Sequence, residues 1–163
     1  MTPKSEVQAA DDDGQQQFEE PNADWLDTRL LVCGSRDWTD AKIVQQIVLG
    51  YLEDAIVNFG RLVLIEGCAR GADRAACQMW DGRPGENGGV RGTHLDLVHE
   101  HYPADWDKHG KAAGPIRNRQ MLKEGRPQVV IAFSDDIENS KGTKDMVTIA
   151  KAAGIPTYVV AHG

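Results

Sequence analysis

A glycine-punctuated turn with charged side chains follows a run of branched apolar residues near the middle of the chain. In the stretch "LVLIEGCARGAD" (62–73) this turn holds Gly67, Arg70, Gly71 and Asp73. Glycine permits backbone angles and close approaches that a Cβ would block, arginine donates hydrogen bonds as a cation, and aspartate can carry a proton. These residue types suit a ligand with an anionic group. In isolation, the same turn could simply connect a strand to a helix.

Polar and glycine residues follow three further apolar runs in the same manner. The turns are "CGSRDW" (33–38), "YPADWDKHG" (102–110) and "SDDIENSKGT" (134–143). From them we expect ligand contacts by Gly34, Ser35, Arg36, Trp106, Lys141, Gly142 and Thr143. Exposed N–H groups at the starts of helices favour an anion such as phosphate. Trp38 and Trp106 could stack on a base, or could equally pack in the core or at the rim.

The segment "GPIRNRQML" (114–122) predicts a helix with functional side chains near its start. Arg117 and Met121 share one helix face, and Asn118 lies beside it. If the helix begins at the pocket, Arg117 and Asn118 project into it. The alternative is a solvated basic face formed by Arg117, Arg119 and Lys123.

Apolar runs that alternate with helical patterns must position these turns. We expect strands at 28–34, 61–67, 93–103, 128–134 and 155–161, and helices at 40–59, 72–80, 111–125 and 143–154. Runs this continuously apolar indicate an α/β fold with a Rossmann-like, doubly wound, mainly parallel five-stranded sheet and helices on both faces. Ligands bind beyond the carboxyl ends of such strands. The stripe Ile43, Ile47, Leu52, Ile56 and Phe59 could cover the sheet or pair two copies as a homodimer.

Charge divides the 163 residues into a tail and one domain. Residues 1–28 hold eight acidic residues and one basic residue, and the remainder holds 17 of each. We predict a flexible acidic tail (1–28), which is either a solubilising leader or a partner-binding arm, and a domain (29–163) with a glycine-rich insertion loop at 81–92. A neutral domain makes nucleic acid an unlikely partner.

Several classes of protein are disfavoured by the motifs that the chain lacks. No signal peptide or long apolar run is present, which predicts a soluble, cytoplasmic protein with no membrane partner. Neither GxGxxG nor GxxxxGK[ST] occurs, so we expect no NAD-type cofactor and no P-loop chemistry. Three cysteines without CxxC spacing suggest neither disulfides nor zinc. We also expect no metal at His94, His99 and His101, because these histidines alternate along one strand and consecutive pairs should not converge on one ion.

Four ordered motifs resemble those of the SLOG superfamily of Rossmann-like domains, in its YspA/YpsA-related branch, a domain of unknown function. They are "VCGSRDW", "EGCARGADRAA", "YPADWDKHGKAAGPIRNRQML" and "KGTKDMVTIAKAAGIPT", within residues 29–161. The superfamily includes the LOG phosphoribohydrolases and DprA-type proteins, so the resemblance implies a pocket for a nucleotide or a nucleotide derivative. It assigns Gly34 and Ser35 to the first loop. The second loop is matched by Gly67, Gly71, Ala72 and Asp73. The family's arginine helix is matched by Arg117, Asn118 and Met121, and its phosphate-contacting glycine-threonine pair by Gly142 and Thr143.

The resemblance leaves two functions open. LOG enzymes carry a catalytic glutamate three residues after the threonine, where this chain has Met146, with Asp145 one residue earlier. A sensor or sequestering module for a nucleotide-derived ligand is therefore expected first. The alternative is a nucleotide N-glycosidic hydrolase of LOG-like phosphoribohydrolase type, with Asp73 or Asp145 as the catalytic carboxylate. Asp105, with His109 nearby, is a further possibility.

Overall fold

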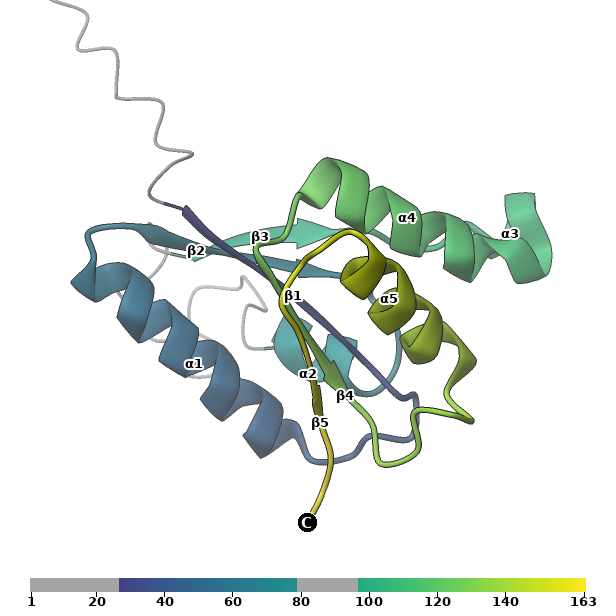
Figure 1. The fold of residues 1–163 in the computed structure, drawn as a ribbon, viewed down its shortest axis with the longest axis horizontal. Helices are drawn as coiled ribbons and strands as arrows, with labels where there is room; N and C mark the ends of the chain where they lie inside the picture. The colour runs from purple at the N-terminus through teal and green to yellow at the C-terminus, as the bar shows by residue number, and fades with distance from the viewer. Residues whose placement is uncertain (1–26, 79–96) are drawn as a thin grey trace, which may run out of the picture.

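A five-stranded parallel sheet forms the centre of the chain in the computed structural model, which describes residues 27–78 and 97–163 (Figure 1). The strands are β1 (Asp27–Gly34), β2 (Arg61–Glu66), β3 (Leu97–His101), β4 (Val129–Phe133) and β5 (Thr157–Val160). Their order in the sheet is β3-β2-β1-β4-β5, and every neighbouring pair is parallel. The predicted α/β Rossmann-like fold is confirmed.

Helices cover both faces of this sheet. They are α1 (Ala41–Val57), α2 (Ala72–Gln78), α3 (Trp106–His109), α4 (Ala113–Gly125) and α5 (Lys141–Ala152), with a 3₁₀ turn at Gly110–Ala112. Helices α1 and α2 pack against each other, and so do α4 and α5. Each of the two pairs belongs to a different core cluster, and α3 extends from the start of α4 beyond the sheet (Figure 1).

Alternation along the strands explains why the central part of β1 is continuously apolar. Leu30 and Val32 pack in the core beneath α1 and α2, whereas Leu31 and Cys33 pack in the core beneath α4 and α5. Successive side chains of a strand point to opposite faces. Both faces therefore require apolar residues along the buried segment 30–33, which shows no alternation of polar and apolar residues.

The buried stripe of α1 differs from the predicted one. Asp40 caps this helix by accepting a hydrogen bond from the N–H of Ile43 at 3.2 Å. The residues that face the sheet are Val44, Val48, Leu52 and Ala55. Of the predicted stripe only Leu52 is fully buried, while Ile56 and Phe59 are exposed. The helix thus covers the sheet, and pairing with a second copy stays a prediction.

The sheet begins slightly before the predicted domain boundary. Asp27 and Thr28 pair with Arg61 and Leu62 as part of β1. Asp27 is buried and accepts hydrogen bonds from the Arg61 guanidinium at 2.9 Å. The rest of the predicted tail and the loop at 81–92 lie outside the described residues. Among the described helices, none is long and apolar enough to cross a bilayer.

Candidate functional site

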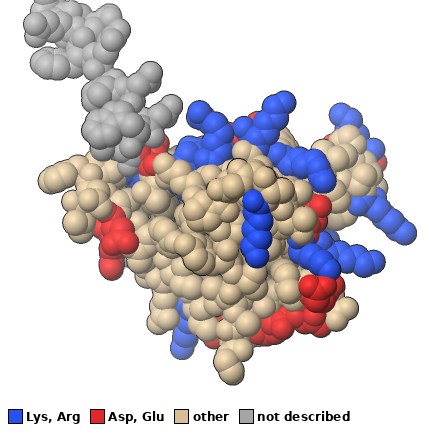
Figure 2. Space-filling model, in the orientation of Figure 1, with Lys and Arg blue, Asp and Glu red and all other residues tan. Residues whose placement is uncertain are grey.

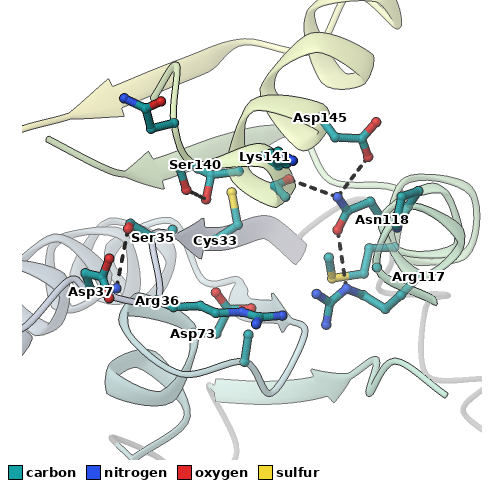
Figure 3. Close-up of a pocket in the computed structure, with 18 of the residues that line it drawn as sticks. Cys33, Ser35, Arg36, Asp37, Asp73, Arg117, Asn118, Ser140, Lys141 and Asp145 are labelled. Atoms are coloured by element: carbon teal, nitrogen blue, oxygen red, sulfur yellow. Dashed lines mark hydrogen bonds between the residues drawn. The ribbon is translucent and has the colours of Figure 1, made fainter. Parts of the chain in front are cut away.

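A cleft of about 530 Å³ lies at the carboxyl edge of the sheet, where β1 meets β4 (Figure 3). The chain winds outward from β1 to β3 on one side and then crosses to β4 and β5 on the other. Such a reversal is where open α/β sheets bind ligands. Eleven predicted site residues line it: Gly34, Ser35, Arg36, Asp73, Trp106, Arg117, Asn118, Lys141, Gly142, Thr143 and Asp145.

Two further predicted residues belong to an adjoining cleft. Gly67 and Arg70 line a space of about 480 Å³, which shares Arg36, Trp106 and Arg117 with the first. The volume of either space is within the range of small-molecule sites. An extended ligand could therefore contact residues of both clefts.

Gly71 was predicted to contact the ligand, and it lines neither of the described clefts, so this contact stays a prediction. Its φ is +85°, and a Cβ there would stand 2.1 Å from the carbonyl oxygen of Ser35. A side chain would meet backbone that cannot move aside easily. Glycine at this position allows the loop after β2 to pack against the loop after β1.

The guanidinium of Arg117 joins three elements. It donates to the carbonyl oxygens of Gly67 and of Tyr102, the latter at 3.3 Å. A Cβ on Gly67 would stand 2.0 Å from Nη1 of Arg117, so glycine is what permits this approach. Helix α4 thus holds the ends of β2 and β3 together while its arginine lines both clefts.

The side chain of Asn118 connects α4 to α5 on the other side of the cleft. Its amide is buried and donates to the carbonyl oxygen of Gly142 at 3.1 Å and to Oδ2 of Asp145 at 3.0 Å, and its Oδ1 accepts from Nε of Arg117 (Figure 3). The amide therefore ties α4 to the first turn of α5. The alternative basic face is present as well, because Arg119 and Lys123 on the same helix are exposed.

Asp73 lies at the floor of the cleft. Its carboxylate is buried and accepts a hydrogen bond from the N–H of Gly67 at 3.0 Å. Burial raises the pKa of Asp73 to about 7, against the opposing effects of the Arg117 charge and the Gly67 N–H. A carboxyl group that titrates near neutrality is suited to proton transfer.

The start of α5 presents hydrogen-bond donors to the cleft. Ser140 precedes the helix without capping it, since its hydroxyl donates to Oγ1 of Thr143 at 2.9 Å instead. The first N–H groups of a helix have no partner within it. Lys141 adds a formal positive charge, and a Cβ on Gly142 would meet no heavy atom within 4 Å. This first turn is open enough for an anionic group to approach closely.

Helix α5 also separates its two candidate catalytic positions. Met146 is fully buried against Met121 and the sheet, whereas Asp145 lines the cleft. Adjacent residues of a helix lie about 100° apart around its axis. The residue three after Thr143 therefore faces the core in this chain, and the carboxylate available to a ligand belongs to Asp145.

The two tryptophans that were predicted as candidates for stacking have different surroundings. Trp106 is 48% exposed at the rim of both clefts, with the guanidinium carbon of Arg36 5.5 Å from its ring centroid. Trp38 is buried: it packs on Phe133, stacks on His162 at 4.2 Å between centroids, and donates from Nε1 to the carbonyl of Asp40. Only Trp106 is positioned to stack on a ligand, and the core interpretation of Trp38 is confirmed.

Asp105 and His109 do not reach the cleft. Asp105 caps α3 by accepting a hydrogen bond from the N–H of Lys108 at 3.0 Å, and His109 ends that helix. Neither residue lines the described clefts. Asp105 therefore caps a helix in the described structure, and its catalytic role is not supported by either cleft.

The expectation that the histidines of β3 do not converge is wrong. The ring centroids of His99 and His101 are 3.8 Å apart, and both rings contact the carboxylate of Glu66. Residues two apart in a strand point to the same face, so alternation along β3 brings these two rings together. His94 lies outside the described residues.

Nine lining residues were not predicted from the sequence as ligand contacts: Cys33, Asp37, Ala69, Lys111, Gly114, Pro115, Met121, Asn139 and Ser140. Asn139 and Ser140 stand directly before Lys141, in the same polar run as the predicted contacts. The Cys33 thiol is buried, and its pKa is raised by that burial and by the nearby Asp73 carboxylate. Lys111 adds a positively charged side chain to the lining of the cleft.

Basic side chains gather on one part of the face that Figure 2 draws. Figure 2 shows Lys and Arg side chains gathered over the side formed by α3, α4 and α5, with much of the acidic surface elsewhere. The cleft itself is lined by four basic residues, Arg36, Lys111, Arg117 and Lys141. They outnumber its three acidic ones, Asp37, Asp73 and Asp145. A ligand with net negative charge fits this balance.

Comparisons with known proteins give one significant relative. No protein-family model matches the chain. No solved structure matches it significantly. The chain is 36% identical over 129 residues to the Gene 61 protein of Mycobacterium phage D29, an alignment that covers 78% of this chain and 92% of the phage protein.

Proposed function

We propose that this chain, which belongs to the family of the Gene 61 protein of Mycobacterium phage D29, binds a nucleotide or nucleotide-derived ligand and acts as a sensor or sequestering module. The observation that carries the proposal is the cleft between β1 and β4, where donors from three loops converge beside an exposed tryptophan. The motifs that resemble the SLOG superfamily support it. We accordingly propose membership of that superfamily as well.

The anionic part of the ligand is assigned to the start of α5. The uncapped first turn, the Lys141 ammonium and the open space at Gly142 together suit a phosphate group. Arg117 stands across the cleft, held by two backbone carbonyls, so its position does not depend on the ligand. A preordered cation lowers the entropy cost of binding.

The base and the ribose are assigned to the other side. The half-exposed ring of Trp106, next to the Arg36 guanidinium, offers a flat surface on which a base can stack. The Asp73 and Asp145 carboxylates line the space between this surface and α5, where hydroxyl groups of a sugar would donate to them. Phosphate, sugar and base thus each have partners of suitable chemistry.

A ligand panel tests the proposal directly. Thermal unfolding of the full chain is measured with AMP, ADP-ribose, cyclic ADP-ribose, NAD and cyclic dinucleotides, and each mixture is then separated by chromatography. A ligand at about 100 times its dissociation constant adds about 2.7 kcal/mol to the free energy of unfolding. Stabilisation with the ligand recovered intact supports the sensor, and no shift with any of them contradicts nucleotide binding.

A pair of glycine variants locates the site. Gly142→Gln places a side chain in the open space at the start of α5, and Gly50→Gln places the same side chain on the exposed face of α1. Neither Cβ meets a heavy atom within 4 Å, so both variants should fold. The proposal requires that Gly142→Gln abolish the thermal shift and that Gly50→Gln preserve it. Equal shifts in both would place the ligand elsewhere.

Hydrolysis of an N-glycosidic bond is the second candidate, favoured by one observation. Asp73, with its pKa raised to about 7, and Asp145 line the same cleft, so one group could supply a proton while the other stabilises positive charge on the sugar. Free base in the chromatograms would indicate this activity. Its loss in Asp73→Asn or Asp145→Asn, with ligand-induced stabilisation retained, would assign the chemistry to that carboxylate.

A further inference from the structure

A second cluster of reactive side chains lies on the α2 side of the sheet, at the carboxyl end of β2 and apart from the residues assigned to the nucleotide. Glu66, Cys77, His99 and His101 each offer a ligand atom, and all four atoms lie within 4.8 Å of one another. Two imidazoles, a thiol and a carboxylate form a mixed set of the kind that binds zinc. Mg²⁺ and Ca²⁺ prefer oxygen atoms throughout.

Strand register explains how the cluster forms. Glu66 of β2 pairs directly with His101 of β3, and His99 pairs with Leu64, which packs beneath α1 and α2. Residues two apart share a face, so Glu66, His99 and His101 all lie on the side that α2 covers. Cys77 comes from the last turn of α2. Three elements that are distant in the sequence thus supply the four groups.

The groups of this cluster gather around one buried carboxylate oxygen, and one buried ring nitrogen beside it has no hydrogen-bond partner among the described residues. Oε1 of Glu66 lies 3.0 Å from Nε2 of His99, contacts Nδ1 of His101, and is 3.4 Å from the Cys68 sulfur. The Glu66 side chain is fully buried and that of His99 is 2% exposed. Even so, Nδ1 of His99 has no hydrogen-bond partner among the described residues. A buried polar atom without a partner calls for an explanation such as a missing ion.

We propose that Glu66, Cys77, His99 and His101 bind one Zn²⁺ ion. In a tetrahedral site with bonds of about 2.0–2.3 Å, neighbouring ligand atoms are separated by about 3.3–3.8 Å. The present spacing therefore needs only small side-chain movements. The ion would attach β3 and the end of α2 to the end of β2, which leads into Gly67, and so would stabilise the wall of the second cleft.

Zinc titration of the full, tag-free chain tests this site. After dialysis against a chelator, the protein is titrated with Zn²⁺ in competition with a chromophoric chelator, and the bound metal is counted by mass spectrometry. We expect one ion per chain and a higher unfolding temperature with Zn²⁺. Substoichiometric binding that the chelating dye removes completely would overturn the proposal, as would unchanged thermal stability.

Variants identify the ligands. His101 is 44% exposed at its side chain, so His101→Ala should fold, and Cys77→Ser preserves side-chain size. Each should weaken zinc binding at least about tenfold, since even groups that only support ligands have effects of that size. His162→Ala is the matched control: His162 lies beside Asp135 and Asp40 and could hold an ion adventitiously. Full binding in His101→Ala, or its loss in His162→Ala, would overturn the assignment.

Cobalt gives a readout that does not depend on a variant folding. Co²⁺ in a tetrahedral site with a thiolate ligand absorbs visible light and shows a sulfur-to-metal charge-transfer band. We expect both in the unmodified chain and loss of the charge-transfer band in Cys77→Ser. Cys68, whose sulfur lies 2.9 Å from Nδ1 of His101, is the alternative sulfur. A band that survives Cys77→Ser and disappears in Cys68→Ser would overturn this ligand set.

Discussion

The guanidinium of Arg117 donates to the carbonyl oxygen of Gly67, across the ends of β2 and α4, in the space where any other residue at position 67 would carry its Cβ. One contact thus links a glycine turn to an arginine helix that is fifty residues further along the chain. The turn after β2 serves first to receive the arginine. This side of the cleft is therefore formed before a ligand binds.

The Gly67–Arg117 contact predicts non-additive effects on stability. In Gly67→Ala the new Cβ meets only the end of a flexible side chain, so the guanidinium should move away and its hydrogen bonds should be lost. We expect a loss of about 1–2 kcal/mol in the free energy of unfolding. In an Arg117→Ala background the same change should cost almost nothing. Urea unfolding of the four proteins measures the coupling, and additive effects would contradict it.

Gly71→Ala provides the contrast. Here the new Cβ would stand 2.1 Å from the backbone oxygen of Ser35, at a φ of +85°, and no side chain can move to relieve the contact. We expect a cost of about 2 kcal/mol or more in the free energy of unfolding. The Arg117→Ala background should not change this cost. Stability within about 0.5 kcal/mol of the parent would show that the two loops have room to separate.

The buried Asp73 carboxyl predicts a pH dependence of stability. Because burial raises its pKa from 3.8 to about 7, the folded state holds the proton more tightly than the unfolded state does. The stabilisation is therefore complete below about pH 4 and is lost as the pH rises towards 7. Burial acts to raise the pKa of Glu66, but hydrogen bonds from His99 and from the Cys68 N–H lower it overall. The contribution of Glu66 to stability therefore has the opposite sign, and it is lost as the pH falls into the acid range.

Asp73→Asn isolates this contribution. Asparagine retains an oxygen that can accept from the N–H of Gly67 but cannot ionise. Stability relative to the parent should therefore increase between pH 5 and pH 8, as measured by urea unfolding at both values. A difference that is constant over this range would mean that Asp73 titrates at its ordinary pKa.

The sequence allowed the fold and the position of the cleft to be predicted, because both follow from local patterns. Continuous apolar runs such as 28–34 require a sheet covered on both faces, and the carboxyl edge follows from its topology. The predictions that failed concerned features that depend on strand register and on backbone angles. Gly67 and Gly71 look equivalent in the sequence, yet one receives an arginine and the other a backbone oxygen.

The zinc cluster was missed for a related reason. His99 and His101 share one face of β3 because they are two residues apart, whereas the group that both rings contact is Glu66 on the neighbouring strand. That pairing depends on the register between β2 and β3, which no spacing within either run reveals. The position of Met146 was likewise inferred from an offset in a motif, and its burial depends on how α5 is rotated over the sheet.

The rotation of α5 predicts that the LOG-type carboxylate cannot be restored by the obvious substitution. Met146→Glu would place a carboxylate in the apolar core cluster that contains Met121 and Val130. We expect it to cost about 3 kcal/mol or more in the free energy of unfolding and to yield no free base from any nucleotide. Asp145→Glu, which only lengthens a side chain that already lines the cleft, should change stability by less than about 1 kcal/mol. Urea unfolding and chromatography of both variants would show the difference. If Met146→Glu were as stable as the parent and cleaved a nucleotide, position 146 would face the ligand. The assignment of Asp145 to the cleft and of Met146 to the core would then be wrong.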